Sequence, residues 1–283
     1  MPTKVDVAVV ILTFNEEQNL PYALDSVCGW ARQVCVFDSF SGDRTVEIAR
    51  DRGCVVQQHR FEDFGQQRNA ALRELPIEAS WVLFLDADEW LPPEFKEEVG
   101  RVIASNPREN GFYCNRRLFW MGAWVRRGYY PTWILRLFRR GTARCEERSV
   151  NEHLIVDGQV GFLAADFIHE DRNGLGRWIE KHNAYASREA EEILKGQSAN
   201  GVATSPFGSQ AERKRWIRER VWNRMPPVVR PFAYFGYRYV LRGGFLDGKA
   251  GLTYHVLQGL WFPLLIDLKY LELRGRTAEP PAA

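Results

Sequence analysis

Three carboxylates stand close together in the segment WVLFLDADEW, residues 81–90. An apolar run suited to a buried strand leads directly into Asp86, Asp88 and Glu89, whose like charges repel one another unless something compensates them. Two aspartates one residue apart are a poor general acid and base pair, because each would need its own environment. They suit Mg²⁺ or Mn²⁺, which prefer oxygen ligands and often share them with substrate phosphates. The alternative is a solvated acidic turn without a ligand.

The elements around these acids predict where a further carboxylate lies. Nearly continuous apolar runs predict buried parallel strands, at 5–12, 33–38, 54–58 and 81–86. Helical patterns alternate with them over short links, which predicts an α/β fold with a Rossmann-like, mostly parallel sheet and helices on both faces. Ligands of such sheets bind beyond the carboxyl ends of the strands. Asp38 ends the second run, so we expect it to share one crevice with Asp86 and Asp88, unless it only caps a turn.

This alternation stops after a helix that Pro93 opens. Two more strands, around 111–116 and 133–138, and a helix at 175–195 are expected. The Gly- and Ser-rich stretch 196–210 indicates a flexible linker. We therefore expect a catalytic domain at 1–195, this linker, and a helical extension at 211–283. The extension is basic and rich in aromatic residues, which favours contact with a membrane surface; a helical subdomain or an oligomer interface is the alternative.

Composition excludes several other classes of protein. The 283 residues carry a formal charge of +2 and are 45% hydrophobic, which is typical of a globular protein and does not favour nucleic-acid binding. The five cysteines form no C-x-x-C pair, so we expect them to be reduced core residues of a cytosolic protein. The sequence has neither the pattern of a signal peptide nor an apolar window of 18 residues. Zinc spacing, a nucleophile elbow and the glycine patterns of phosphate and dinucleotide loops are also missing.

Four blocks of sequence together resemble glycosyltransferase family 2. They occur in order as VVILTFNEEQNL, VFDSFSGDRTVEIA, FGQQRNAAL and VLFLDADEWL. The resemblance covers residues 5–170 well. Within the family, the sequence is similar to the bacterial branch that includes lipopolysaccharide core glucosyltransferases. The resemblance implies a GT-A fold, a D-x-D metal motif and a nucleotide-sugar donor.

The resemblance also implies a role for particular residues. Asp86 would contact the ribose or the metal, Asp88 would ligate the metal directly, and Glu152 would be the general base that deprotonates the acceptor. His153 is a further possible metal ligand. The remaining donor-binding residues would be Thr13, Asn15, Glu16, Asp38 and Arg68. The chain departs from the family where Phe40 replaces a loop glycine and where Asn151 replaces a histidine that the branch often has.

The acceptor side is predicted from chemistry rather than resemblance. Aromatic residues alternate with arginines between 116 and 136, and aromatic faces pack on sugar rings while arginines bind phosphate or carboxylate. Trp124, Tyr130 and Arg136 are the candidates. Aromatic residues that simply pack beneath a loop are the alternative, and RNA stacking is disfavoured by the small net charge.

We therefore expect a metal-dependent, inverting hexosyltransferase that uses Mg²⁺ or Mn²⁺ and a UDP-linked sugar. Its acceptor would be a bacterial surface glycan or glycolipid such as lipopolysaccharide core. The enzyme would lie in the cytoplasm, peripheral on the inner membrane, and could form a homo-oligomer. A polyprenyl-phosphate glycosyltransferase and a non-catalytic nucleotide-sugar-binding protein are the alternatives.

Overall fold

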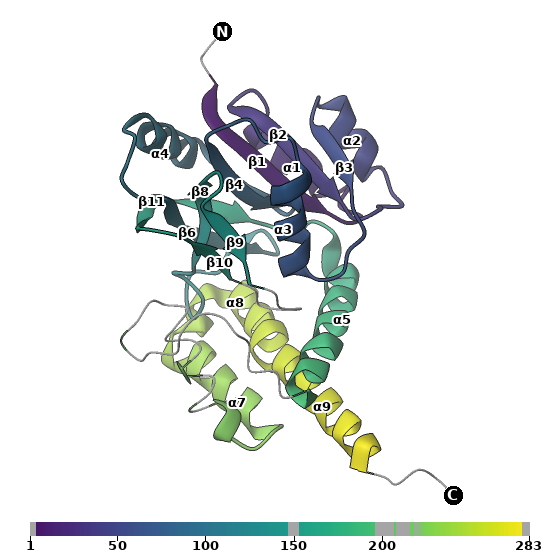
Figure 1. Cartoon of the computed structure of the whole chain (residues 1–283). Coiled ribbons are helices and arrows are strands. Elements are labelled where there is room, and N and C mark those ends of the chain that lie inside the picture. Colours follow the sequence, from purple (N-terminus) through teal and green to yellow (C-terminus); the bar gives the residue numbers. More distant parts are fainter. Residues whose placement is uncertain are drawn as a thin grey trace, which may run out of the picture. The chain divides into compact units, whose positions relative to one another are not determined.

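The computed structural model describes residues 4–146, 153–195, 207, 216–217, 220 and 222–278, and the chain forms two compact units (Figure 1). Unit 1 consists of Met1–Phe119 and Pro131–Gly174, and unit 2 of Trp120–Tyr130 and Leu175–Ala283. These bounds differ from the predicted ones, since the helix expected at 175–195 belongs to unit 2. The expected linker at 196–210 lies, apart from residue 207, outside the described residues.

Unit 1 is built on one mixed sheet with the strand order β3-β2-β1-β4-β8-β6-β11-β5. Its strands are β1 (Val5–Thr13), β2 (Ala31–Asp38), β3 (Val55–Gln58), β4 (Trp81–Asp86), β5 (Glu89–Trp90), β6 (Gly111–Trp120), β8 (Trp133–Arg139) and β11 (Val160–His169). The first four in the sheet order are parallel, and β8 is antiparallel to both of its neighbours. β11 runs parallel to β6, and β5 pairs antiparallel with β11. The predicted α/β fold is confirmed, with a sheet that is parallel in its first half and mixed in its second.

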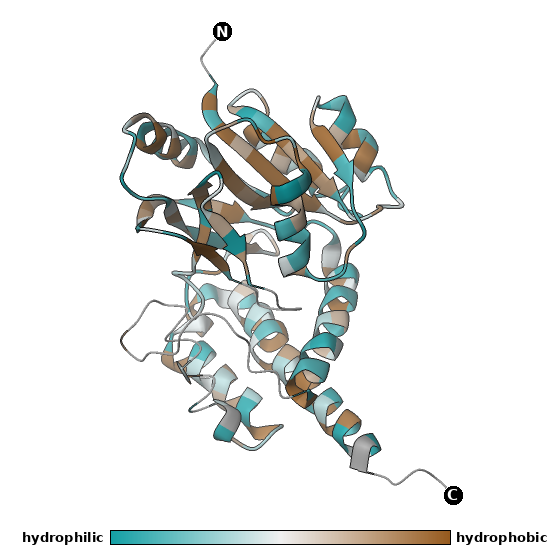
Figure 2. Cartoon of the chain, viewed as in Figure 1, coloured by the Kyte–Doolittle hydropathy of each residue, from teal (hydrophilic) through white to brown (hydrophobic). Residues whose placement is uncertain are grey.

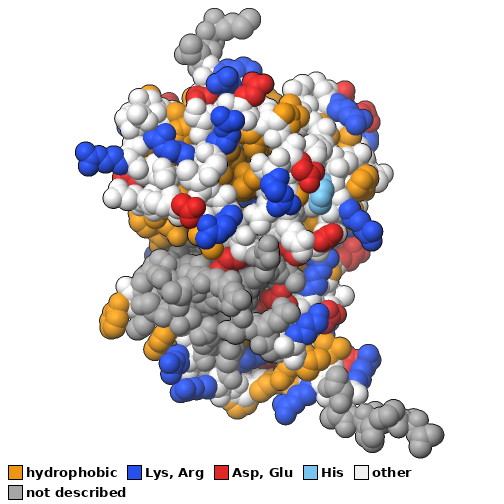
Figure 3. Space-filling view, viewed as in Figure 1, with side chains coloured by type: hydrophobic (Ala, Val, Ile, Leu, Met, Phe, Trp, Pro, Cys, Tyr) orange, Lys and Arg blue, Asp and Glu red, His pale blue; other side chains and the backbone are white. Residues whose placement is uncertain are grey.

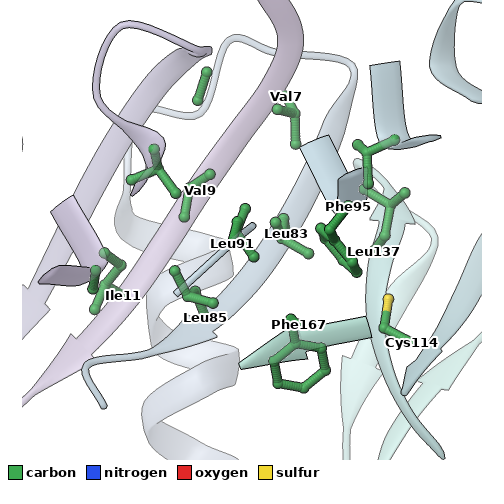
Figure 4. Close-up of a cluster of buried hydrophobic side chains, with 14 of the residues drawn as sticks. Val7, Val9, Ile11, Leu83, Leu85, Leu91, Phe95, Cys114, Leu137 and Phe167 are labelled. Carbon is green, nitrogen blue, oxygen red and sulfur yellow. The ribbon is translucent and has the colours of Figure 1, made fainter. Parts of the chain in front are cut away.

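The apolar side chains of β1 alternate between two cores, one on each face of the sheet. Val7, Val9 and Ile11 pack in one core (Figure 4), together with residues of α1 (Leu20–Val27), α2 (Thr45–Asp51) and α4 (Pro93–Ala104). Ala8 and Val10 pack in the other core, against α3 (Phe64–Glu74). The central strands are mostly brown in Figure 2, as expected of strands covered on both sides.

Sequence periodicity explains why these helices form where they do. In α1, Leu20, Ala23, Leu24 and Val27 are buried at a helical spacing. In α3, the Asp63 carboxylate caps the first turn by accepting a hydrogen bond of 2.7 Å from the backbone N–H of Gln66. These helices, and α4 opened by Pro93, confirm the predicted ones.

A short antiparallel ribbon, β9 (Ala143–Cys145) with β10 (Leu154–Val156), flanks residues 147–152, which lie outside the described part of the chain. The Asn69 side chain of α3 fixes this ribbon. Its amide donates to the carbonyl of Cys145 at 3.0 Å, and its oxygen accepts from the N–H of Cys145 at 2.8 Å.

Unit 2 is mainly helical. Its elements are β7 (Ala123–Trp124), α5 (Gly174–Leu194, from Leu175 onward), η1 (Trp222–Arg224), α7 (Val229–Phe235), η2 (Gly236–Leu241), η3 (Gly244–Asp247), α8 (Gly248–Tyr254), η4 (His255–Trp261) and α9 (Phe262–Ala278). A turn and a helix approach closely at Gly251, where an added Cβ would lie 2.3 Å from the carbonyl oxygen of Gly244. None of the helices in the described segments is both long and apolar enough to cross a membrane.

A buried ion pair holds two helices of unit 2 together. Arg230 of α7 donates through Nε to both carboxylate oxygens of Asp267 on α9, at 3.0 and 2.9 Å, and Asp267 also accepts from the N–H of Val228. Both side chains are almost fully buried. Each charge therefore depends on the other for compensation.

We expect Asp267→Ala to lower the free energy of unfolding by about 3–5 kcal/mol, because it leaves the Arg230 charge buried and unpaired. The matched control is Glu272→Ala on the same helix, whose partner Arg276 is exposed, so the loss should stay below about 1 kcal/mol. Urea denaturation of both variants measures the difference. Equal losses would contradict the assignment.

Candidate active site

The carboxyl ends of three parallel strands bring the sequence-predicted acids to one edge of the sheet. In the sheet register Thr13 at the end of β1 is opposite Asp38 of β2, and Leu12 is opposite Asp86 of β4. Asp38 and Asp86 therefore lie on either side of the end of β1. The register therefore places both acids at the edge of the sheet where the crevice was predicted.

Asp38 is fully buried and its carboxylate is already engaged within the protein. It accepts hydrogen bonds from the Thr13 hydroxyl at 2.9 Å, from the N–H of Ser41 at 2.9 Å and from the Gln58 amide at 3.0 Å. These bonds hold the loop after β2 in shape. Within that loop Phe40 has a φ of 58°, the left-handed conformation that favours glycine, and its ring is exposed.

Two loops at this edge are tied together by the residues predicted to bind the donor. Asn15 donates its N–H to the Ser41 hydroxyl, and its side-chain oxygen accepts from the N–H of Gly42, both at 2.8 Å. The carboxylate of Glu16 accepts from the amides of Asn19 at 2.8 Å and Asn173 at 3.0 Å. The side chains of Thr13, Asn15 and Glu16 therefore hold the loops at this edge of the sheet. The bond from Asn173 to Glu16 also joins the segment after β11 to the loop after β1.

A buried arginine compensates the carboxylates of the D-A-D-E turn. Arg136 of β8 donates to Asp86 through Nη1 at 3.2 Å and Nη2 at 2.6 Å, and through Nη2 to Glu89 at 2.8 Å. Arg68 of α3 adds a bond of 3.2 Å to Asp86, and Arg116 lies 3.7 Å from Glu89. Three guanidinium groups therefore face two of the three carboxylates.

This arrangement of charges shifts the pKa values of Asp86 and Glu89 in opposite directions. Burial would raise the pKa of Asp86, but the charges of Arg136 and Arg68 outweigh it and hold that pKa far below its usual range. Burial raises the pKa of Glu89, against the opposing charge of Arg136. Burial would lower the pKa of the Arg136 guanidinium, but Asp86 and Glu89 raise it, so this cation stays charged. Asp86 is thus a permanent carboxylate.

Asp88 is buried beside a histidine that the sequence analysis did not single out. The Nδ1 atom of His169, at the end of β11, lies 3.4 Å from an Asp88 carboxylate oxygen and 4.0 Å from Glu89. The pairing of His169 with Glu89 in the β11–β5 ladder brings it there. In sequence the only signal is a histidine that ends an apolar strand, FIH. Within the described part of the chain, no three His, Cys, Asp or Glu side chains gather as a metal site by themselves.

Glu152, the predicted general base, lies outside the described residues, but both ends of its segment are placed. The N–H of Glu146 donates to the carbonyl of His153 at 3.0 Å, and His153 Nδ1 lies 3.2 Å from the Glu146 carboxylate. His153, predicted as a possible metal ligand, is thus paired with Glu146. The bonds between Asn69 and Cys145 hold the residues just before this segment next to α3, the helix that carries Arg68.

The three predicted acceptor residues belong to different units of the chain. Arg136 is buried in unit 1 and bound to Asp86 and Glu89, so it serves the charge cluster. Trp124 and Tyr130 belong to unit 2, where their rings pack edge to face with centroids 5.4 Å apart. Arg126 covers the Trp124 ring at 4.6 Å.

We expect Arg136→Met to lower the free energy of unfolding by about 3–5 kcal/mol at neutral pH, because the buried Glu89 loses its hydrogen-bonded cation and Asp86 keeps only Arg68. The low pKa of Asp86 means that its stabilising contribution is present above the unfolded pKa of about 4 and is lost in acid. The deficit of the variant should therefore shrink as pH falls through this range. Denaturation as a function of pH measures it.

The control is Arg139→Met on the same strand, whose hydrogen bonds go to the Asn106 side chain and the Pro107 carbonyl. With no carboxylate in these bonds, its deficit should not change with pH. The same pH dependence in both variants would contradict the role of Arg136.

Known proteins are similar to this chain in sequence and in fold. The family model for glycosyl transferase family 2 matches residues 8–152, just over half of the chain. An uncharacterized glycosyltransferase of Rickettsia typhi is 24% identical over 253 residues, which cover 85% of this chain and 81% of that protein. The lipopolysaccharide core biosynthesis glycosyltransferase LpsC of Rhizobium meliloti is 26% identical over 204 residues, 68% of this chain and 73% of LpsC.

Among solved structures, the mannosyltransferase PcManGT from Pyrobaculum calidifontis, in complex with GDP-mannose and Mn²⁺, is similar with a TM-score of 0.51. The alignment covers 98% of this chain and 89% of that one at 14% identity, so the likeness is one of fold. The segment that the family model matches includes the carboxyl ends of β1, β2 and β4 and the D-A-D-E turn. The chain belongs to glycosyl transferase family 2.

Proposed function

We propose that the protein is a metal-dependent, inverting glycosyltransferase that moves a hexose from a UDP-linked donor to a hydroxyl of lipopolysaccharide core or a related bacterial surface glycan. The observation that carries the proposal is the pairing of Asp88 with His169 beside a fully compensated Asp86 at the carboxyl edge of the sheet. The likeness to LpsC supports the acceptor class. The complex of PcManGT with GDP-mannose supports a nucleotide-sugar donor.

The donor would lie across the strand ends. Its nucleoside would approach the loop after β2, where the Phe40 ring is exposed and could stack on the base. A polar contact to Asp38 would have to replace one of its present hydrogen bonds. The diphosphate would lie toward the D-A-D-E turn, where Arg68 adds a positive charge.

Asp88 and His169 fit a divalent cation. One carboxylate and one imidazole nitrogen are donors that Mn²⁺ accepts, and His169 Nδ1 is buried without a hydrogen bond. Two protein ligands leave positions for diphosphate oxygens and water, as is common for such ions. A cation there would neutralise charge on the leaving diphosphate. Asp86, bound by two arginines, would orient the ribose or a metal-bound water.

Glu152 would supply the base. Inversion by direct displacement needs a carboxylate that takes the acceptor proton while the acceptor oxygen bonds to the anomeric carbon and the bond to the diphosphate breaks. Cys145, which precedes the segment that contains Glu152, is bonded to Asn69 of α3. A lipid-linked acceptor also motivates the proposed location, peripheral on the cytoplasmic face of the inner membrane.

We expect Asp88→Asn to lower Mn²⁺-dependent UDP release by about two orders of magnitude or more, as for loss of a group that stabilises transition-state charge. The amide keeps the size of the side chain, so the melting temperature of the free protein should change little. The increase in melting temperature on adding UDP and Mn²⁺ together should disappear. Asp157→Asn, an exposed residue paired with Arg144, is the control. Normal UDP release by Asp88→Asn would reject the metal assignment.

We expect Glu152→Gln to retain donor affinity but to lower kcat about 10²–10⁴-fold, the range for a lost general base. The amide is nearly isosteric and cannot accept the proton. Steady-state kinetics together with calorimetric binding of the UDP-sugar separate the two effects. Glu147→Gln in the same segment is the matched control. Loss of donor binding with normal turnover of bound donor would assign Glu152 to the donor site instead.

A further inference from the structure

One helix of unit 2 has its apolar side chains on the outside. α7 and η2 form a continuous helical run, Val229–Leu241. Its exposed large apolar residues, which we call the outer stripe, are Val229, Phe232, Tyr237, Val240 and Leu241. Leu241 is 78% exposed, Val240 57% and Phe232 55%. Amphipathic helices of globular proteins place such residues toward the core.

The charged side chains of the same helix point inward. Arg230 is bound to Asp267, and Arg238 donates to the carbonyl of Gly128 at 2.9 Å while it lies over the rings of Tyr129 and Tyr234. Both arginines are about 95% buried. Burying a guanidinium group is unfavourable without polar or aromatic partners, and both arginines have such partners on this side, so this orientation is built into the unit.

The π-helical turn of η2 keeps the two faces separate. Its i→i+5 bond from the N–H of Arg242 to the carbonyl of Tyr237 widens the turn. Residues five apart, such as Phe232 and Tyr237, therefore share the outer face, and Arg238 stays on the side of Arg230. Turns of this kind occur frequently at functional sites.

The apolar surface continues into the next turn. Gly243 has a φ of 71°, which lets the chain reverse, and Phe245 and Leu246 after it are 50% and 58% exposed. The outer stripe and this turn thus present seven large apolar side chains. A monomeric protein in water rarely exposes so many together, which marks a contact surface.

The charges around this surface indicate what it contacts. From Val229 to Val256 the exposed charged side chains are both cationic, Arg242 and Lys249, whereas Asp247 is half-buried and accepts from the N–H of Arg127. Unit 2 has 19 lysines and arginines against 10 acids, a formal charge of +9. Unit 1 has 19 against 26, a charge of −7, and the two give the +2 of the chain. Lysine and arginine side chains lie beside apolar ones over the helices of unit 2 (Figure 3).

We propose that the outer stripe and the Phe245–Leu246 turn insert into the interfacial region of an anionic lipid bilayer. Apolar side chains would lie at the acyl boundary while Arg242 and Lys249 meet the headgroups. RNA would match the cations but not the apolar stripe. A second copy of the chain would match the stripe but would bring another unit of charge +9 against it. Binding requires no turnover, so the proposal stands or falls separately from the proposed reaction.

The test is sedimentation of the full-length protein with vesicles of phosphatidylglycerol and phosphatidylethanolamine. Leu241→Asp should lower the partition coefficient about tenfold or more, because it removes a large apolar group and places a charge in the interface. Arg242→Gln and Lys249→Gln should each lower it about fivefold, and added salt should reduce these differences. Leu241 is exposed, so its variant should melt like the wild type.

Leu175→Asp is the matched control, since it makes the same change at an exposed leucine of another helix of unit 2. It should bind vesicles like the wild type apart from the effect of one charge. Unchanged sedimentation of Leu241→Asp, or an equal loss in both variants, would overturn the proposal. So would equal binding to phosphatidylcholine vesicles, retention by single-stranded RNA alone, or a dimer that Leu241→Asp dissociates while neither protein binds vesicles.

Discussion

Compensation of the carboxylates that follow β4 is the constraint on which the rest of unit 1 depends. Asp86, Asp88 and Glu89 lie at the end of a buried strand, where uncompensated charge is unfavourable. Arg136 can reach two of them only because β8 enters the sheet antiparallel next to β4 and carries a buried guanidinium to the same edge. The mixed second half of the sheet is therefore part of the site and not only its support.

This compensation also gives Asp86 and Asp88, which look equivalent in sequence, different surroundings. The carboxylate of Asp86 accepts from two arginines, so much of its capacity to bind a ligand is taken up inside the protein. Asp88 instead faces an imidazole. The Asp88 side chain is also more buried, 9% exposed against 35% for Asp86, so the two aspartates of the D-A-D-E turn lie in different environments.

Local patterns predicted much of unit 1, because buried parallel strands are continuous apolar runs. The register of these strands places Asp38 and Asp86 on either side of the end of β1. The sequence did not predict His169 as a site residue. Its position depends on the pairing of β11 with β5, which is a contact between distant parts of the chain and leaves no local sequence pattern. Arg136 was predicted to bind the acceptor because its ion pairs with Asp86 and Glu89 are also contacts between distant parts of the chain. An arginine in an aromatic stretch has the same sequence signal whether it is exposed or buried against carboxylates from another strand.

Unit 2 shows the same limit in a helix. The helical spacing of the sequence does not reveal the outer stripe, because Phe232 and Tyr237 share a face only through the π-helical turn, and it does not say which side of the helix faces the core. That choice follows from distant partners, since Asp267 and the Gly128 carbonyl bind the arginines of the opposite face. Turning the helix over would bury the stripe but leave two guanidinium groups without these partners. A buried, paired arginine contributes its favourable energy in only one orientation of the helix, so the polar contacts determine which apolar residues remain at the surface.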